Sequence, residues 1–188
     1  MTPMMSRRTA LRTAFAAAVL PAASAWAGFN FFTNEYTATR AELQAQIERH
    51  FPVAQRYAEI FTVGLREPQL GLDARTNRAA LTAVLSIASP LLQPAAIQGV
   101  VTVSSALKYD AATRTLRLDQ PKAERLELQG ITGRDAERLQ QIGAVVAQEL
   151  LRDQALRTFK PEELTVGRKT YEIGDITVVG DGIKVQLR

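Results

Sequence analysis

The sequence has 188 residues, of which 46% are apolar and 22% charged, and its formal net charge is +4. This is the composition of an ordinary globular protein, and it excludes a multi-span membrane protein and a disordered chain. Cysteine is absent and His50 is the only histidine, so disulfides, thiolate metal sites, a cysteine nucleophile and clusters of histidine ligands are excluded.

The first 27 residues have the features of an export signal. Three arginines lie among the first 12 residues, and the first acidic residue is Glu35. A weakly apolar stretch over residues 14–23 is too short to span a bilayer, and Ala25-Trp26-Ala27 matches the small-residue site that signal peptidase cleaves. We therefore expect residues 1–27 to be a cleaved signal peptide, residues 28–188 to form a single globular domain, and the protein to be periplasmic and soluble.

The signal fits two export systems, the twin-arginine route and the general secretory route. The run SRRTALR at residues 6–12 resembles the twin-arginine motif, but Ala10 replaces its usual phenylalanine, so the general secretory route also fits. Removal of 27 residues leaves 161, and it takes away three of the 23 basic residues and none of the 19 acidic ones. The remaining charge is about +1, and without a basic stripe we expect no nucleic-acid partner. We also expect no transmembrane anchor.

The beginning of the expected domain combines an aromatic segment with a short helix. Residues 29–36 are rich in aromatic side chains and fit a strand or a docked arm. Thr39 and Glu42 have the spacing of a capping box, which satisfies free backbone N–H groups at a helix start. Pro52 predicts that this helix ends at Phe51. One face of the predicted helix carries Leu43, Ile47 and Phe51.

Between residues 58 and 128 the apolar residues repeat with a period of two, which is typical of strands. The alternation is clearest over residues 80–87 and 101–109. The segment DAATR at 110–114 predicts a turn that leads into a strand at 116–118. Shorter strands are expected at 60–63, 70–72 and 123–128, with the prolines between them in loops or at strand edges.

A helical period returns from Thr132 and continues to about Phe159, which predicts one long helix. Gly143 inside this helix indicates that another backbone comes close there. One broad arc of the helix is apolar and collects Ala136, Leu139, Ile142, Gly143, Val146, Ala147, Leu150 and Leu151. The opposite side carries Glu137, Gln141, Gln148 and Arg152.

The last residues predict strands again, with a hairpin turn at Gly180-Asp181-Gly182. The order of elements resembles the YceB-like family of small periplasmic lipoproteins, a family of unknown function. The resemblance is carried by Tyr36-Thr37, by Glu42-Leu43 with Ile47, by the long helix from Arg134 to Phe159, and by Gly174-Asp175-Ile176 onward. This chain lacks the lipid-modified cysteine of that family, so the resemblance implies a soluble form of a tethered protein.

The resemblance also implies a fold. It is an α+β fold in which a curved antiparallel β-sheet wraps around one long amphipathic helix, with a short N-terminal helix in addition. This architecture is related to one half of the tubular lipid-binding, BPI-like proteins, which hold acyl chains between helix and sheet. No catalytic or ligand residues of the YceB-like family are settled, so the resemblance implies none here.

The apolar arc and the resemblance together predict a non-enzymatic periplasmic protein that binds a lipid-like or other apolar small molecule. Leu139, Ile142, Val146 and Leu150 are the expected ligand-binding residues. A solid core would need the same residue types as a lined cavity, so the arc alone does not distinguish them. The alternative is therefore a protein-interaction module of the cell envelope, with a solid core and no ligand, that uses residues 29–36 as its contact surface.

Catalytic chemistry has little support in the sequence. His50 is expected to pack partly on the edge of the core, and no serine lies in a G-x-S-x-G elbow. Glu162-Glu163 is read as the start of a turn rather than a glycosidase pair. Asp175 and Asp181 are read as turn formers rather than cation ligands. Phosphate-binding glycine loops are absent, so we expect no enzyme, no cofactor and no metal.

Overall fold

The computed structural model describes residues 29–30, 34–166 and 168–188. More than half of these residues lie in β-strands, which are accompanied by two α-helices and one 3₁₀ helix. In chain order the elements are β1 (Phe29–Asn30), β2 (Glu35–Thr39), α1 (Arg40–Glu48), β3 (Val53–Tyr57), β4 (Phe61–Asp73), β5 (Arg78–Ala88), β6 (Ala96–Asp110), β7 (Thr115–Leu128), α2 (Gly133–Leu151), β8 (Ala155–Thr158), η1 (Pro161–Leu164), β9 (Thr165–Val166), β10 (Lys169–Thr170), β11 (Ile173–Val179) and β12 (Gly182–Leu187).

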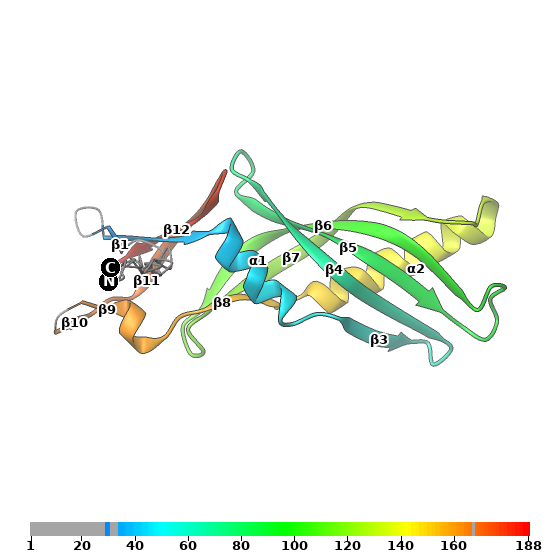
Figure 1. Cartoon of the computed structure of the whole chain (residues 1–188), viewed down its shortest axis with the longest axis horizontal. Helices are drawn as coiled ribbons and strands as arrows, with labels where there is room; N and C mark the ends of the chain where they lie inside the picture. Colours follow the sequence, from blue (N-terminus) through cyan, green and yellow to red (C-terminus); the bar gives the residue numbers. More distant parts are fainter. Residues whose placement is uncertain (1–28, 31–33, 167) are drawn as a thin grey trace, which may run out of the picture.

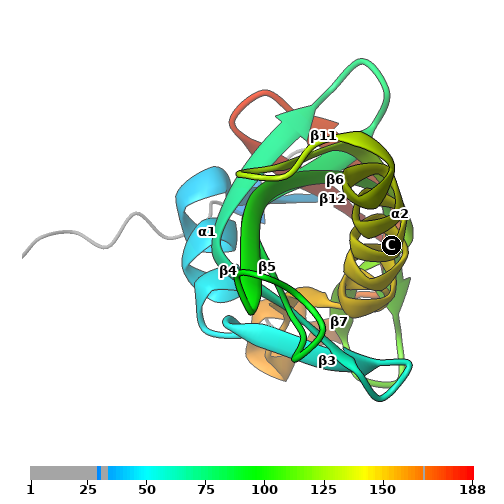
Figure 2. The same ribbon diagram turned by 90° about the vertical axis from the view of Figure 1, so that its right-hand side faces the viewer.

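The main sheet is antiparallel and has six strands in the order β3-β4-β5-β6-β7-β8. Its four central strands contain 13, 11, 15 and 14 residues. Because strands twist in one direction, such long strands accumulate enough twist to curl the sheet into a half-barrel (Figure 2). A second sheet, in the order β1-β2-β12-β11, lies at one end of the half-barrel (Figure 1).

Strand alternation decides which side chains enter the half-barrel. In β5 every second residue is buried, including Leu81, Leu85 and Ile87, while Thr82 and Ser86 on the other face are partly exposed. The buried set faces α2, since the side chains of Leu85 and Ile87 lie next to the helix backbone. The side chains on the concave face are therefore apolar, and those on the convex face of β5 are mostly small and partly polar.

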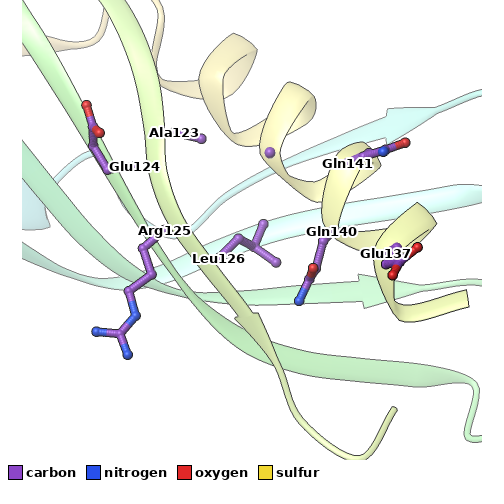
Figure 3. Close-up of a pocket in the computed structure, with 8 residues that line it drawn as sticks. Ala123, Glu124, Arg125, Leu126, Glu137, Gln140 and Gln141 are labelled. Atoms are coloured by element: carbon purple, nitrogen blue, oxygen red, sulfur yellow. The ribbon is translucent and has the colours of Figure 1, made fainter. Parts of the chain in front are cut away.

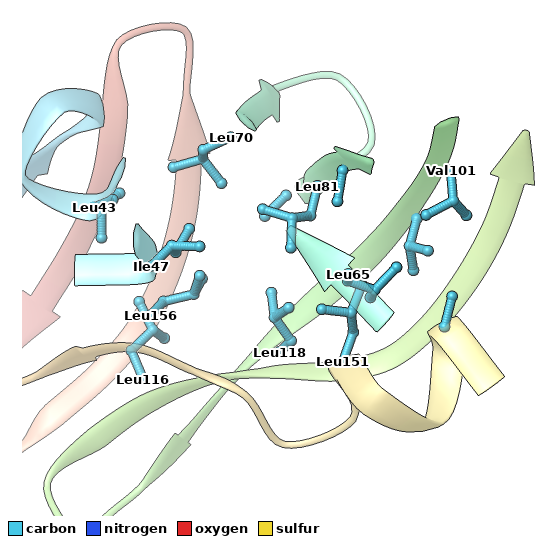
Figure 4. Packing of buried hydrophobic residues seen from close by; sticks show 14 of the residues in the cluster. Leu43, Ile47, Leu65, Leu70, Leu81, Val101, Leu116, Leu118, Leu151 and Leu156 are labelled. Carbon is cyan, nitrogen blue, oxygen red and sulfur yellow. The ribbon is translucent and has the colours of Figure 1, made fainter. Parts of the chain in front are cut away.

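One apolar cluster joins both sheets and both helices. Figure 4 shows Leu43 and Ile47 of α1 and Leu151 of α2 packed with side chains of the main sheet. The second sheet contributes buried residues such as Ile183 and Val185 to the same cluster. The two sheets therefore share a core, and neither buries its apolar face alone.

The expected α+β fold, with a curved sheet wrapped around one long helix and a short N-terminal helix, is wrong. The described chain is mostly β, and its main sheet is a half-barrel. Helix α2 has 19 residues, and it lies along the open side of the half-barrel where it contacts the edge strand β3 as well as β7 (Figure 2). The helix thus closes a gap between sheet edges instead of occupying the centre of a wrapped sheet.

The expected helix end at Phe159 is also wrong, because backbone pairing on β7 overrides the apolar pattern. Arg152 adopts an extended conformation and Asp153 has a positive φ of 58°. The N–H of Leu118 then donates to the carbonyl of Gln154 at 2.9 Å. Strand β8 continues this pairing against residues 115–117. Residues 155–158 therefore extend the sheet rather than the helix.

In two places, a pair of short strands predicted from the sequence forms a single long strand in the structure. The strands expected at 60–63 and 70–72 form β4, in which a register shift between Arg66 and Gln69 accommodates Pro68. Those expected at 116–118 and 123–128 form β7, which contains Pro121. A bulge absorbs a proline by taking its residue out of the regular ladder. The sequence pattern did not predict β3, whose residues are mostly exposed.

Several local predictions are confirmed. The Thr39 side chain accepts from the Glu42 N–H, and the Thr39 N–H donates to the Glu42 carboxylate at 2.9 Å, which completes the capping box. The turn at 110–114 joins β6 to β7, and the turn at Gly180-Asp181 joins β11 to β12. The described residues contain no helix that is long and apolar enough to cross a membrane. The predicted signal peptide and residues 31–33, which include Phe31 and Phe32, lie outside the described residues.

Candidate functional site

The four residues expected to bind a ligand lie on the face of α2 that packs on the half-barrel. Leu139 and Val146 are buried in the shared core, with 5% and 2% of their surface exposed. Ile142 and Leu150 are half-buried and pack against that core. The structure therefore brings the four together on one helix face, where they are covered mainly by other side chains of the protein.

The surroundings of Gly143 show how closely α2 approaches the sheet. A Cβ atom at this position would lie 3.1 Å from Leu126 Cδ1, 3.1 Å from Leu85 Cδ2 and 3.2 Å from Ile87 Cδ1. The expected close neighbour was a backbone, but the neighbours are side chains of β5 and β7. Contacts this short leave no room for a ligand at the middle of the helix.

A pocket of about 390 Å³ lies beside α2, and we call it the helix groove. Figure 3 shows it between β7 and α2, with Leu126 directed toward the helix. None of the four expected ligand residues lines it. Its lining consists of Ala123, Glu124, Arg125 and Leu126 from β7 and Glu137, Gln140, Gln141 and Ala144 from α2. Five of these eight residues carry a charged or amide side chain, so the groove offers polar contacts that an acyl chain would not use.

A second pocket, of about 400 Å³, lies at the end of the half-barrel away from the second sheet. The register of β4, β5 and β6 brings Thr62, Ala88 and Ala96 level at this end, which we call the mouth. None of the residues that line the pocket is charged: they are Gln93, Pro94, Ala96, Ile97, Gln98, Gln129, Gly130 and Ile131. Sequence reasoning missed this pocket because one wall comes from residues 93–98, where a loop enters β6, and the other from residues 129–131, about 35 residues later in the chain.

Large apolar side chains are exposed around the mouth. Leu91 in the β5–β6 loop is 71% exposed, and Ile60 and Tyr57 beside the β3–β4 turn are 42% and 41% exposed. Exposed apolar residues that cluster in this way mark contact sites more often than isolated ones do. The mouth is thus an apolar opening at one end of the apolar concave face.

The opposite end of the half-barrel holds an arginine, Arg157, whose side chain is 13% exposed. The Nη2 atom of Arg157 donates to the Tyr36 hydroxyl at 2.9 Å and to Glu163 Oε1 at 2.7 Å. Its guanidinium lies 5.9 Å from the ring centres of both Tyr36 and Phe159. Burial raises the pKa of Tyr36, an effect that the nearby positive charge of Arg157 opposes. This cluster joins β8 of the main sheet to β2 of the second sheet.

The residues considered for catalysis do not form a site. His50 is exposed just beyond the end of α1, so the expectation that it packs on the core edge is wrong. The Ser105 hydroxyl donates to the Asp119 carbonyl at 2.7 Å, and the Ser104 hydroxyl donates to Glu124 at 2.7 Å. Both serines therefore serve the pairing of β6 with β7 through hydrogen bonds.

The acidic residues are mostly occupied by turns and ion pairs. The Thr113 hydroxyl donates to Asp110 at 2.7 Å and lowers the pKa of that carboxyl. Asp175 pairs with Arg188 at 2.8 Å, and Glu163 pairs with Arg157 as described. Within residues 29–30, 34–166 and 168–188 no three acidic or histidine residues come together as a metal site.

No family model matches this chain, and a comparison with curated proteins finds no match either. The functional inference therefore depends on the geometry of the mouth and of the helix groove. Both are lined by amide groups, but they differ in charge, because only the groove carries charged residues: Glu124, Arg125 and Glu137.

Proposed function

We propose that this chain is a periplasmic, non-enzymatic binding protein for a hydrophobic, lipid-like ligand that enters through the mouth. The observation that carries this proposal is an uncharged pocket of about 400 Å³ at the open end of an apolar half-barrel. Pockets of this size are typical of small-molecule sites. Membership of the YceB-like family stays a prediction, and the pocket does not depend on it.

The pocket residues suggest how such a ligand would lie. Ile97 and Ile131 offer apolar contacts, and Gln93, Gln98 and Gln129 offer amide groups for a polar head. Of the residues expected from the sequence, Leu139 and Ile142 lie in the half of α2 that begins at the mouth. They do not line the pocket, and together with Val146 and Leu150 they belong to the packed core behind it.

Binding of dansyl-labelled undecanoic acid, followed by its fluorescence, tests the proposal. We expect micromolar affinity, and an Ile131→Glu variant should bind at least about ten-fold more weakly because a carboxylate would replace one of the two isoleucines that offer apolar contacts in the pocket. The matched control is Val145→Glu, since Val145 is 55% exposed on the outer side of α2 and lines neither pocket. Absence of binding to the parent protein, or an equal loss in both variants, would contradict the proposal.

The second candidate is the interaction module of the cell envelope with a solid core. The close contacts at Gly143 favour it, because they fill the helix–sheet interface at its middle. Mass spectrometry of an organic extract from natively purified protein distinguishes the two functions. A stoichiometric lipid supports the first candidate, and repeated clean extracts together with no probe binding support the second.

A further inference from the structure

Strand β7 has a free edge along most of its length. On one side it pairs with β6 from Thr115 to Leu128. On the other side β8 pairs only with residues 115–117, and Leu118 makes two further backbone hydrogen bonds to residues 153 and 154. From Asp119 onward no strand among the described residues covers this side. Every second residue of an antiparallel strand points its N–H and C=O away from its partner. Arg78 Nη2 donates to the Gln120 carbonyl at 3.2 Å, and beyond Gln120 this edge presents backbone groups without a strand partner.

The free edge opens into the helix groove. Ala123 and Leu126 of β7 line the groove from the sheet side, and Ala144 lines it from α2 (Figure 3). The helix wall also carries Glu137, Gln140 and Gln141. In the described part of the chain, none of these three side chains makes a hydrogen bond or an ion pair. The groove thus combines small and apolar contacts with free polar groups on one wall and a free strand edge on the other.

We propose that the helix groove binds an extended polypeptide segment of a partner protein, which adds to β7 as an extra strand. Unpaired backbone groups along a strand edge are a template for another strand. An acyl chain could not satisfy these donors and acceptors, whereas a peptide backbone satisfies them at regular intervals. Alternate side chains of the segment would point toward Leu126 and toward solvent.

The charges of the groove specify the partner further. Arg125 pairs with Glu127, and Glu124 accepts from Ser104 and lies 3.9 Å from Lys122. Glu137 is left as the unpaired charge on the helix wall, so the segment should carry a lysine or arginine opposite it. This inference depends on the β7 edge and not on the mouth pocket, so peptide binding and lipid binding can fail separately.

A phage-displayed library of random heptapeptides, selected on the folded protein, provides the probe. Enriched peptides are then synthesised and their dissociation constants measured by fluorescence anisotropy. We expect enrichment of a basic residue. Two versions of each peptide are compared, one N-methylated at the odd positions and one at the even positions. One version should bind at least about ten-fold more weakly and the other nearly unchanged, because an added strand uses every second N–H to pair with its neighbour. No peptide that binds below about 100 µM, or equal weakening of both versions, would overturn the proposal.

Variants of neighbouring helix residues locate the binding site. Ala144→Arg fills the groove and should weaken peptide binding at least about ten-fold, while Val145→Arg adds the same side chain outside the groove and should leave it unchanged. Glu137→Lys should shift the selected peptides from basic to acidic residues. Circular dichroism confirms that the variants fold. An equal loss in the two arginine variants, or the same basic preference with Glu137→Lys, places the peptide elsewhere and refutes the assignment. Binding of the dansyl fatty acid should be unaffected by Ala144→Arg.

Discussion

The end of the half-barrel next to the second sheet is filled by aromatic rings around a paired arginine, while the mouth at the other end exposes Leu91, Ile60 and Tyr57. At the filled end, Phe159 is 1% exposed and lies edge-on to Tyr36 and Tyr109, with ring centres 5.4 and 6.3 Å apart. At the mouth, Leu91, Ile60 and Tyr57 contact solvent, and a pocket lined by uncharged residues lies at the same end. Burial stabilises a fold and exposure leaves a surface available, so stability should depend on the first end and binding on the second.

The largest difference between the two ends should come from their apolar side chains. Phe159→Ala removes a fully buried ring and should lower the free energy of unfolding by about 3–5 kcal/mol. Leu91→Ala at the mouth should change it by less than about 0.5 kcal/mol, since Leu91 is mostly exposed. Urea denaturation followed by circular dichroism measures both. Similar losses in the two variants would mean that the mouth is packed in solution.

The cluster around Arg157 should give the second-largest effect on the free energy of unfolding. Arg157→Met removes the donor to Tyr36 and Glu163 and should lower the free energy of unfolding by about 2 kcal/mol, because Tyr36 is buried and loses its partner. Arg188→Met breaks an ion pair with Asp175 whose side chains are 65% and 80% exposed, and it should cost less than about 0.5 kcal/mol. Equal urea midpoints for the two variants would show that Arg157 does not hold the two sheets together.

The two helices differ at the threonine that precedes each of them. Thr39 caps α1 through its side chain, so Thr39→Ala should lower the free energy of unfolding by about 1 kcal/mol. Thr132 precedes α2 but makes no side-chain cap hydrogen bond, so Thr132→Ala should have almost no effect. Thermal and urea denaturation of both variants test this matched pair. A larger loss at Thr132 would contradict the structure of the mouth end of α2.

The smallest effect concerns pH at the filled end. Burial raises the pKa of Tyr36 above its ordinary value of about 10, with the charge of Arg157 acting in the opposite direction. A pKa that is higher in the folded state stabilises the protein below the unfolded value, and this stabilisation is lost as the pH rises through the folded value. Stability should therefore fall above about pH 10, and less so in Tyr36→Phe. Titration of the phenolate absorbance measures the Tyr36 pKa, and a value near the ordinary one would contradict the expected rise.

Local sequence patterns predicted much of the fold. The alternation in residues 80–87 and 101–109 corresponds to β5 and β6, and the turn chemistry placed both hairpins. The Thr39–Glu42 spacing predicted a capping box that the structure contains. These features depend on neighbours within a few residues, so the sequence carries their signal directly.

The overall architecture depended on pairing between distant segments. Residues 155–158 have apolar spacing that suits a helix, yet their backbone pairs with β7, about 40 residues earlier in the chain. Bulges joined predicted short strands into β4 and β7, and no local pattern distinguishes a bulged strand from two strands. The sequence therefore led us to expect a sheet wrapped around a helix, whereas the structure is a half-barrel whose open side is closed by a helix.

The candidate sites depended on tertiary structure even more strongly. The apolar arc of α2 was determined by the sequence, but its coverage by Leu85, Ile87 and Leu126 was not. Glu137 and Gln141 fall on the polar side of the helix in the sequence, and only the position of β7 makes them a wall of a groove. The sequence by itself determined which side chains avoid water, because that property follows from local chemistry and periodicity. Only the tertiary structure decided what lies against them, because contacts between distant strands depend on how the whole sheet curls.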